Sequence, residues 1–211
     1  MTNISKKCIL EVERKFRSLA VHHLTKTSGN PPFKSLLSLP PQKIRDTYFN
    51  DKLGLLSSSG IWIRRRNGLW QAKVSKGGNY TNSQFEELDD MNEIADCVKR
   101  VTGLGRGEEE GFGLGIMADF MTERERWMAD EEFTIVRDEM DFGHVVGEVE
   151  LQKEWVGDGE EGKREEMRRM DLRLKGFMKR YGWAFDMGGE KEVEGKLTAY
   201  FRIMGKSPTD F

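Results

Sequence analysis

Short segments in which apolar and polar residues alternate follow one another along most of the 211-residue chain. The clearest pair is "GIWIRRRNGLWQAKVS", where two alternating runs flank Asn67 and Gly68. An Asn-Gly pair in this setting favours a two-residue β-hairpin turn, because both residues accept the positive φ angles that the turn requires. Consecutive strands joined by short turns pair as antiparallel neighbours. The chain is therefore predicted to be mainly β, as an antiparallel sheet or barrel.

The same pattern predicts eight or nine strands in all, with two helices at the side. The expected strands are Ile9–Phe16, Lys43–Asp51, the two arms of the hairpin, Ser83–Leu88, Asp119–Met128, Glu132–Glu139, Gly143–Gln152 and Gly195–Ile203. The expected helices are Asp90–Gly103, which ends in a glycine, and Lys163–Trp183. The stretch His22–Pro41 is predicted to be irregular, and the glycine-rich stretch Gly103–Gly115 to be a mobile surface loop.

Length and charge narrow the classes of function. A chain of 211 residues favours a single domain, here residues 1–211, that is large enough to bury a core. Charged residues make up 33%, yet 34 Lys and Arg against 36 Asp and Glu leave a net charge of −2. This balance argues against bulk binding of nucleic acid or of an anionic membrane. We expect the charges to act locally, on a small molecule.

Nothing in the sequence indicates export or a membrane span. The two cysteines, Cys8 and Cys97, have no CxxC partner, so neither a zinc site nor a disulfide framework is expected. The first 16 residues lack the apolar run of a signal peptide, and no stretch approaches the roughly 18 apolar residues of a membrane span. We expect a cytoplasmic monomer.

The segment "ILEVERKF" sets charged residues against apolar ones in an unusual way. Glu11, Glu13 and Lys15 fall on one side of the expected strand, and Leu10 and Val12 on the other. Other strands repeat the pattern with charges sorted by sign. Their charged faces carry Trp62, Arg64 and Arg66; Gln71 and Lys73; Arg124 and Arg126; Glu148 and Glu150; and Lys196, Thr198 and Tyr200.

Two interpretations of these charged faces are open. They are either the solvated faces of a sandwich or the lining of a closed barrel. Like charges two positions apart on a strand gain nothing from proximity. Their sorting by sign therefore favours a bound ligand of complementary charge. Unpaired ions in a dry interior cost several kcal/mol each, so such a lining must be wet. Converging arginines and lysines suit a row of phosphates, and carboxylates from neighbouring strands suit Mg²⁺ or Mn²⁺.

The ordered set of motifs resembles the CYTH superfamily, the triphosphate tunnel enzymes. "EVERK" matches its ExExK signature, and "RDTYF", "WIRRR", "WQAK", "EEL", "TERERW", "DFGHVVGEVE" and "GKLTAYF" follow in the family's order over nearly the whole chain. The resemblance is greatest to the eukaryotic thiamine triphosphatase branch. It implies a closed antiparallel eight-stranded barrel that forms a triphosphate tunnel. It also implies a metal-dependent hydrolase that removes the terminal phosphate of thiamine triphosphate, with Mg²⁺ or Mn²⁺ as cofactor.

The resemblance also implies residue roles. The metal ligands it implies are Glu11, Glu13 and Glu150, with Glu148 and Asp138 as further acids. The triphosphate binders it implies are Lys15, Arg64, Arg66, Arg124 and Lys196. Lys73 and Tyr48 match the pair that activates the attacking water, and Arg126 and Glu87 share the parity of the site. One departure is Val136, which stands where the family tends to carry the first acid of Asp-x-Asp.

Several alternatives stay open at this point. The chain could be an inorganic triphosphatase, another tunnel enzyme such as a cyclase, or a silent polyphosphate-binding module. A lysine acts as a base only when neutral, so we expect neighbouring arginines to lower the pKa of Lys73; its alternative role is one more phosphate clamp. Glu148 and Lys73 also count among the expected substrate contacts. Trp62, two residues before Arg64, is expected to attract the cationic thiazolium ring of thiamine, or else to be ordinary core.

Overall fold

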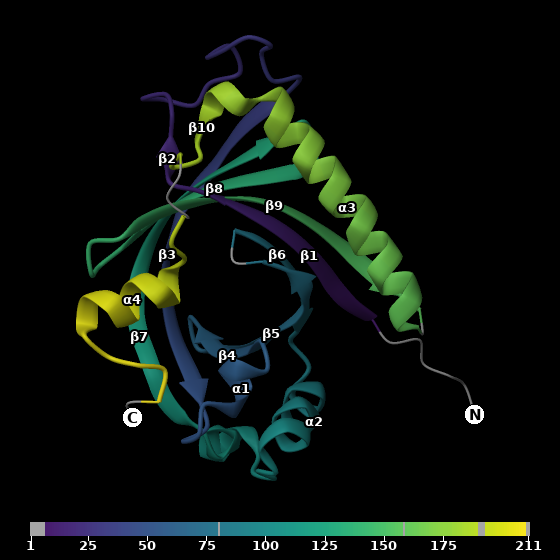
Figure 1. The fold of residues 1–211 in the computed structure, drawn as a ribbon, viewed down its shortest axis with the longest axis vertical. Helices are drawn as coiled ribbons and strands as arrows, with labels where there is room; N and C mark the ends of the chain where they lie inside the picture. The colour runs from purple at the N-terminus through teal and green to yellow at the C-terminus, as the bar shows by residue number, and fades with distance from the viewer. Residues whose placement is uncertain (1–6, 80, 158, 190–192, 210–211) are drawn as a thin grey trace.

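Eight antiparallel strands close into a barrel. The computed structural model of the protein describes residues 7–79, 81–157, 159–189 and 193–209. Around the barrel the strand order is β1-β6-β5-β4-β3-β7-β8-β9 (Figure 1). The strands are β1 Lys7–Phe16, β3 Leu36–Asn50, β4 Ile61–Arg66, β5 Leu69–Gly78, β6 Asn82–Leu88, β7 Gly115–Ala129, β8 Phe133–Met140 and β9 Val145–Val156. This confirms the predicted fold class.

Helices and short elements cover the outside and one end of the barrel. The helices are α1 Leu55–Ser58, α2 Met91–Thr102, α3 Glu160–Arg180 and α4 Lys196–Met204, with 3-10 turns at Glu108–Gly113 and Gly182–Ala184. A separate two-stranded sheet joins β2 Ser18–Leu19 to β10 Phe185–Asp186. Within the described ranges, no helix has the length and apolar character needed to cross a membrane.

The hairpin and the first predicted helix form as the sequence indicates. Asn67 and Gly68 join β4 to β5 with φ angles of 50° and 88°, as a primed turn requires. Helix α2 begins after Asp90, whose side chain accepts hydrogen bonds from the backbone N–H groups of Asn92 and Glu93. It ends at Gly103, which has a left-handed φ of 74°.

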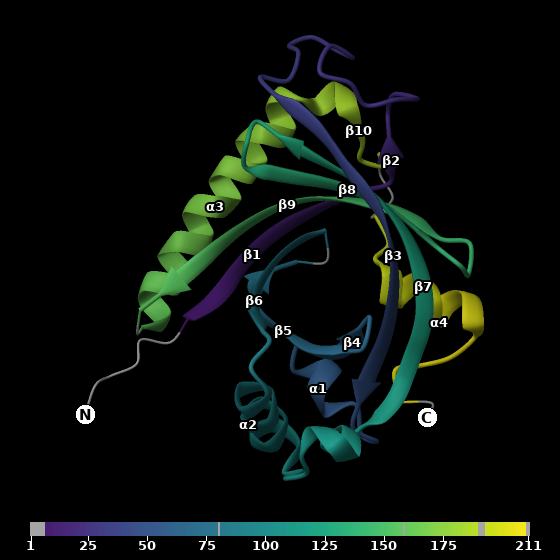
Figure 2. The ribbon, with the colours of Figure 1, turned by 180° about the vertical axis from the view of Figure 1, so that it is seen from behind.

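The alternation of β1 places its two faces against different environments. The side chains of Leu10 and Val12 point outward and are fully buried under α3, in a cluster that includes Met170 and Leu174. Arg14, which interrupts this apolar face, pairs with Asp171 of α3 at 2.5 Å. The opposite face of β1 therefore points into the barrel (Figures 1 and 2).

Three predicted elements differ from the structure. The last segment is not a strand but the helix α4, which begins after Gly195. Its apolar residues Leu197, Tyr200 and Phe201 recur at intervals of three and four, the spacing of a helix face, and they pack with a cluster that includes Phe120. Lys196 and Thr198 still reach the barrel interior, as predicted, whereas Tyr200 packs in this cluster instead.

The prediction of an irregular His22–Pro41 is wrong beyond Leu36, where β3 begins. The register with β7 shifts between Leu39 and Gln42, so Pro40 and Pro41 lie in a bulge that requires no N–H group from them.

The glycine-rich stretch is also more ordered than a surface loop. It contains the turn Glu108–Gly113, and Phe112 is buried edge-on against Trp70 with ring centroids 4.9 Å apart.

The packing of α3 on the barrel gives a direct stability test. Leu174 is fully buried in the interface, whereas Leu172, two residues earlier on the same helix, is 54% exposed. Leu174→Ala is expected to lower the free energy of unfolding by about 2–5 kcal/mol. Leu172→Ala is the matched control and should change it by no more than about 0.5 kcal/mol. Equal effects in urea denaturation would contradict the packing described here.

Candidate functional site

The barrel encloses a cavity of about 470 Å³. Because successive strand residues point to opposite faces, alternate residues over part of β1, β4, β5, β6 and β9 reach it. Its cationic lining is Lys15, Arg64, Arg66, Lys73, Arg124 and Lys196. Its acidic lining is Glu11, Glu13, Glu87, Glu148 and Glu150. Tyr48, Trp62 and Phe85 add aromatic surface. The interpretation of the charged faces as a barrel lining is therefore the one that the structure adopts.

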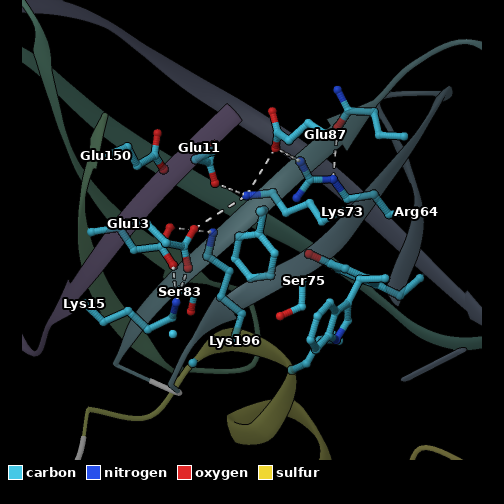
Figure 3. A pocket seen from close by; sticks show the side chains of 18 of the residues that line it. Glu11, Glu13, Lys15, Arg64, Lys73, Ser75, Ser83, Glu87, Glu150 and Lys196 are labelled. Carbon is cyan, nitrogen blue, oxygen red and sulfur yellow. Dashed lines mark hydrogen bonds and ion pairs between the residues drawn. The ribbon is translucent and has the colours of Figure 1, made fainter. Parts of the chain in front are cut away.

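The acids of β1 and β9 lie side by side across one pair of strands. Glu13 stands opposite Glu150 in the register, and Lys15 stands opposite Glu148. The ammonium group of Lys15 contacts Glu13 and lies 3.4 Å from Glu148. Four carboxylates from these two neighbouring strands, those of Glu11, Glu13, Glu148 and Glu150, thus line the same cavity. Figure 3 shows the first two and Glu150.

Burial and mutual repulsion act unequally on these acids. Burial, and then the Glu148 charge, raise the pKa of Glu13. Burial, and then the Glu11 charge, raise the pKa of Glu150 to about 8. Burial would also raise the pKa of Glu148, but Lys196 and Lys15 hold it well below its ordinary value. The site thus contains acids whose negative charge the protein alone does not fully compensate.

Lys73 reaches from β5 into the acidic part of the cavity. Its Nζ contacts Glu11 and lies 3.2 Å from Glu87 and 3.5 Å from Glu13. Burial would lower the pKa of Lys73, but the charges of Glu11, Glu87 and Glu13 raise it well above its ordinary value. Arg64 lowers this pKa as expected, but the three carboxylates outweigh it, and sequence parity could not show how close they lie to the ammonium group.

Asp138 does not line the cavity, although it was predicted as a metal ligand. It is fully buried behind Arg124, whose guanidinium donates two hydrogen bonds to its carboxylate at 2.7 and 2.6 Å. Lys196 of α4 contacts the same carboxylate. Burial would raise the pKa of Asp138, but Lys196 and Arg124 hold it below its ordinary value. Asp138 thus joins two cavity-lining cations rather than facing the cavity itself.

The remaining arginines are positioned by polar neighbours. Asp46, which sequence reasoning did not single out, receives two hydrogen bonds from Arg66 at 2.8 and 2.7 Å. The signal was present, because Asp46 lies two residues before Tyr48 on the same strand face. Arg64 donates to Gln71 at 2.9 Å and lies 3.8 Å from Glu87, which confirms the inward parity of Glu87.

Two further residues, Arg126 and Val136, share the strand parity of the site residues but do not line the cavity. Arg126 is half-buried and donates to the backbone oxygen of Pro40 at 3.4 Å. Val136, fully buried, stands opposite Glu148 in the register between β8 and β9.

One part of the cavity wall is aromatic and apolar. Trp62 and Phe85 meet edge to face with ring centroids 5.7 Å apart. Leu197, from the first turn of α4, lines the same cavity and packs with Trp62 against a shared cluster. Phe85 and Leu197 were not predicted. The parity of β6 could have found Phe85, whereas Leu197 depends on the helical fold of α4.

The donor set can be tested against a divalent metal. Carboxylate oxygens are the ligands that Mg²⁺ and Mn²⁺ prefer, and Glu11, Glu13, Glu148 and Glu150 supply eight of them on two adjacent strands. In the described ranges, no three acidic, histidine or cysteine side chains are grouped around one point as metal ligands. The donor chemistry fits such an ion, and the chain's own cations contact these oxygens instead.

The chain is similar in sequence to one protein family and to a human protein. The sequence model of the CYTH domain matches residues 10–180. Human thiamine-triphosphatase is 34% identical over an alignment of 124 residues that covers 50% of this chain and 54% of that protein. The match thus spans about half the length of the human relative.

Two solved structures share the fold. One is a protein from Pyrococcus horikoshii, with a TM-score of 0.51 and 16% identity over 91% of this chain and 98% of that one. The other is a Hippeastrum protein described as a putative adenylyl cyclase with a dominant triphosphatase activity. Its TM-score is 0.53, with 19% identity over 94% of this chain and 97% of that one.

Proposed function

The chain belongs to the CYTH domain family, and we propose that it is a metal-dependent triphosphatase that releases the terminal phosphate of thiamine triphosphate. The observation that carries this proposal is the cavity itself. Among the described residues, six cations and five carboxylates line a space of about 470 Å³ inside a closed barrel. A metal–triphosphate complex, which presents both phosphate oxygens and a cation, is the class of ligand that answers both sets of charges.

The cations are proposed to bind the phosphates. Arg64, Arg66 and Arg124 are preoriented by Gln71, Asp46 and Asp138, so their planar groups face phosphate oxygens with little further loss of freedom. Lys15 and Lys196 add charge from β1 and α4. Stabilising the charge that develops on the transferred phosphoryl group is the main task in this reaction, and it needs cations at fixed positions.

The carboxylates are proposed to hold the metal. Glu11, Glu13, Glu148 and Glu150 are the residues that would bind Mg²⁺ or Mn²⁺, and such an ion would supply charge neutralisation on the phosphates. Asp138 is left out of this set because its carboxylate is taken by Arg124 and Lys196.

Lys73 and Tyr48 take different parts in the proposed reaction. Because its pKa is raised, the Lys73 amine stays protonated near neutral pH and has no lone pair with which to accept a proton. We therefore assign Lys73 to charge stabilisation rather than to the role of general base. Tyr48 lines the cavity opposite Arg64 in the register of β3 and β4. We propose that its hydroxyl group orients the attacking water.

The thiamine part of the substrate is proposed to lie against Trp62. Thiamine carries a fixed positive charge, and tryptophan is the side chain that attracts such a cation best, by about 0.5–2 kcal/mol. Similarity to human thiamine-triphosphatase points the same way. The Hippeastrum protein, described as having a dominant triphosphatase activity, supports the second candidate, an inorganic triphosphatase or another triphosphate tunnel enzyme that is not restricted to thiamine triphosphate. A silent polyphosphate-binding module would need the cations of the cavity more than its acids.

Trp62→Ala is therefore expected to act selectively. The change should lower kcat/KM for thiamine triphosphate by up to about 30-fold, the equivalent of about 2 kcal/mol, and leave inorganic triphosphate nearly unaffected. Trp62→Phe, which keeps an aromatic face, is the matched control and should lose less. An equal loss on both substrates would mean that Trp62 only supports the fold.

A panel of three substrates tests the proposed specificity. Thiamine triphosphate, inorganic triphosphate and ATP are each assayed with Mg²⁺ over a range of concentrations. We expect the highest kcat/KM for thiamine triphosphate. A preference for inorganic triphosphate or ATP would replace the thiamine assignment by the broader one, and binding without turnover would favour the silent module.

We further propose that the protein acts as a cytoplasmic monomer.

A further inference from the structure

The ammonium group of Lys73 lies among carboxylates from two other strands. It contacts Glu11, and it lies within 3.5 Å of Glu13 of the same strand and within 3.2 Å of Glu87 of β6 (Figure 3). Glu11 and Glu13 are also the carboxylates proposed as metal ligands. The protein has thus placed a cation of its own against the oxygens that a metal would need.

Every carboxylate oxygen of Glu11 and Glu13 has a partner in the structure. One oxygen of Glu11 contacts Lys73, and the other accepts a hydrogen bond from Gln152 at 2.5 Å. One oxygen of Glu13 contacts Lys15, and the other is the one near Lys73. A metal that binds these two residues must therefore share their oxygens with the ammonium groups, whose like charge opposes it, or displace one of them.

Lys73 is the cation best placed to withdraw. It projects from β5, and among the described residues its ammonium group meets the carboxylates of Glu11, Glu13 and Glu87 and lies 5.1 Å from the ring centroid of Phe85. Arg64, a like charge, lies on the neighbouring strand and shares Glu87 with it. An anion that enters between Arg64 and Lys73 would attract the ammonium group away from Glu11.

We propose that Lys73 is a built-in counter-ion that competes with the divalent metal for Glu11 and Glu13, so that metal binding depends on triphosphate binding. A triphosphate draws Lys73 onto its phosphate oxygens and frees the two carboxylates for the metal. By thermodynamic reciprocity, the metal in turn frees Lys73 for the triphosphate. The inference rests on the proposed function, because the triphosphate is the anion that moves Lys73.

The consequence can be measured with metal alone. Mn²⁺ is titrated into the full chain without any phosphate compound, and free Mn²⁺ is followed by electron paramagnetic resonance. Wild type should bind weakly, because Lys73 holds Glu11 and Glu13. Lys73→Gln removes the competing charge and is expected to bind Mn²⁺ at least about tenfold more tightly, since a nearby like charge no longer opposes the ion.

Two controls identify the source of the gain. Lys76→Gln makes the same charge change on the same strand, but Lys76 pairs with Glu86 and Glu160 outside the cavity. Its Mn²⁺ affinity should equal that of wild type. Adding Glu11→Gln to Lys73→Gln should abolish the gain, because one of the freed ligands is then lost. If Lys73→Gln does not fold, as judged by its thermal melt, Lys73→Met carries the same test.

The outcomes separate this inference from the proposed function. Unchanged or weaker Mn²⁺ binding by folded Lys73→Gln overturns the counter-ion role, even if wild type hydrolyses triphosphates with Mg²⁺. A gain shared by Lys76→Gln overturns it as well, because the effect would then be one of overall charge. Tighter Mn²⁺ binding that Glu11→Gln abolishes supports the role, and it does so even if no triphosphate is hydrolysed, a result that would refute the proposed function alone.

Discussion

Glu13→Gln is expected to lower kcat/KM for thiamine triphosphate by about 100-fold or more without unfolding the barrel. Glu13 is buried in the cavity wall opposite Glu150, where it serves as a proposed metal ligand. Weakening a bound metal that supplies several kcal/mol of transition-state stabilisation by about 3 kcal/mol lowers the rate by about 100-fold, since each 1.36 kcal/mol is tenfold in rate. The amide keeps the size of the side chain, so the loss should come from the charge.

The measurement compares Glu13→Gln with Glu139→Gln, an identical change on the outside of β8. Glu139 is exposed and pairs with Arg137 at 3.1 Å on the barrel surface. It should keep wild-type kcat/KM, since exposed ion pairs contribute no more than about 1 kcal/mol. Unchanged turnover in Glu13→Gln would remove this residue from the site, and a collapsed thermal melt would show a structural role instead.

Glu150→Gln is expected to stabilise the metal-free protein at pH 8, by about 4 kcal/mol, while it lowers hydrolysis by about 100-fold. Burial, and then the charge of Glu11, raise the pKa of Glu150 from 4.5 to about 8. The ionised carboxylate is therefore unfavourable in the folded protein. Glutamine removes that cost, but it also removes a proposed metal ligand.

The pH dependence has a definite sign. Between the unfolded value of 4.5 and the folded value of about 8, folded Glu150 holds a proton that the unfolded chain has released. Its contribution to stability is therefore lost as the pH rises through this window, and the full cost is present above pH 8. The advantage of Glu150→Gln should be about 1 kcal/mol near pH 5 and grow by about 3–4 kcal/mol towards pH 8.

Urea denaturation in excess chelator at the two pH values measures this difference. A variant that is less stable than wild type at pH 8 would mean that the charge of Glu150 is well compensated in the free protein. The electrostatic cost assigned to the ionised Glu150 carboxylate would then be absent. An unchanged rate of hydrolysis would separately remove Glu150 from the metal ligands.

The parity of the strands could be predicted from the sequence alone. Alternation in "EVERK" and "WIRRR" indicated which side chains share a face, and the structure puts Glu11, Glu13, Arg64 and Arg66 into one cavity. The Asn67-Gly68 turn fixed the register of the hairpin, because a two-residue loop leaves little freedom for pairing. These features depend on residues that are close in sequence, and the sequence pattern alone can therefore predict them.

Contacts between distant segments were beyond that reasoning. Lys73 contacts Glu11, which lies 62 positions earlier in the chain. The direction of the Lys73 pKa shift therefore depends on barrel closure. Asp138 has the parity of the site, but Arg124 and Lys196 cover it. The segment of α4 alternates well enough to resemble a strand, and its packing on Phe120 decides for a helix.

The most direct test of the central claim is phosphate release from thiamine triphosphate by the purified wild-type protein, with Mg²⁺ and with excess chelator. The cavity unites phosphate-binding cations with carboxylates whose charge calls for a further cation. The account predicts stoichiometric release of one phosphate with Mg²⁺ and a loss of at least about 100-fold in chelator, the order expected when a metal supplies several kcal/mol of charge stabilisation. Full activity in chelator, or no release in either condition, would contradict it.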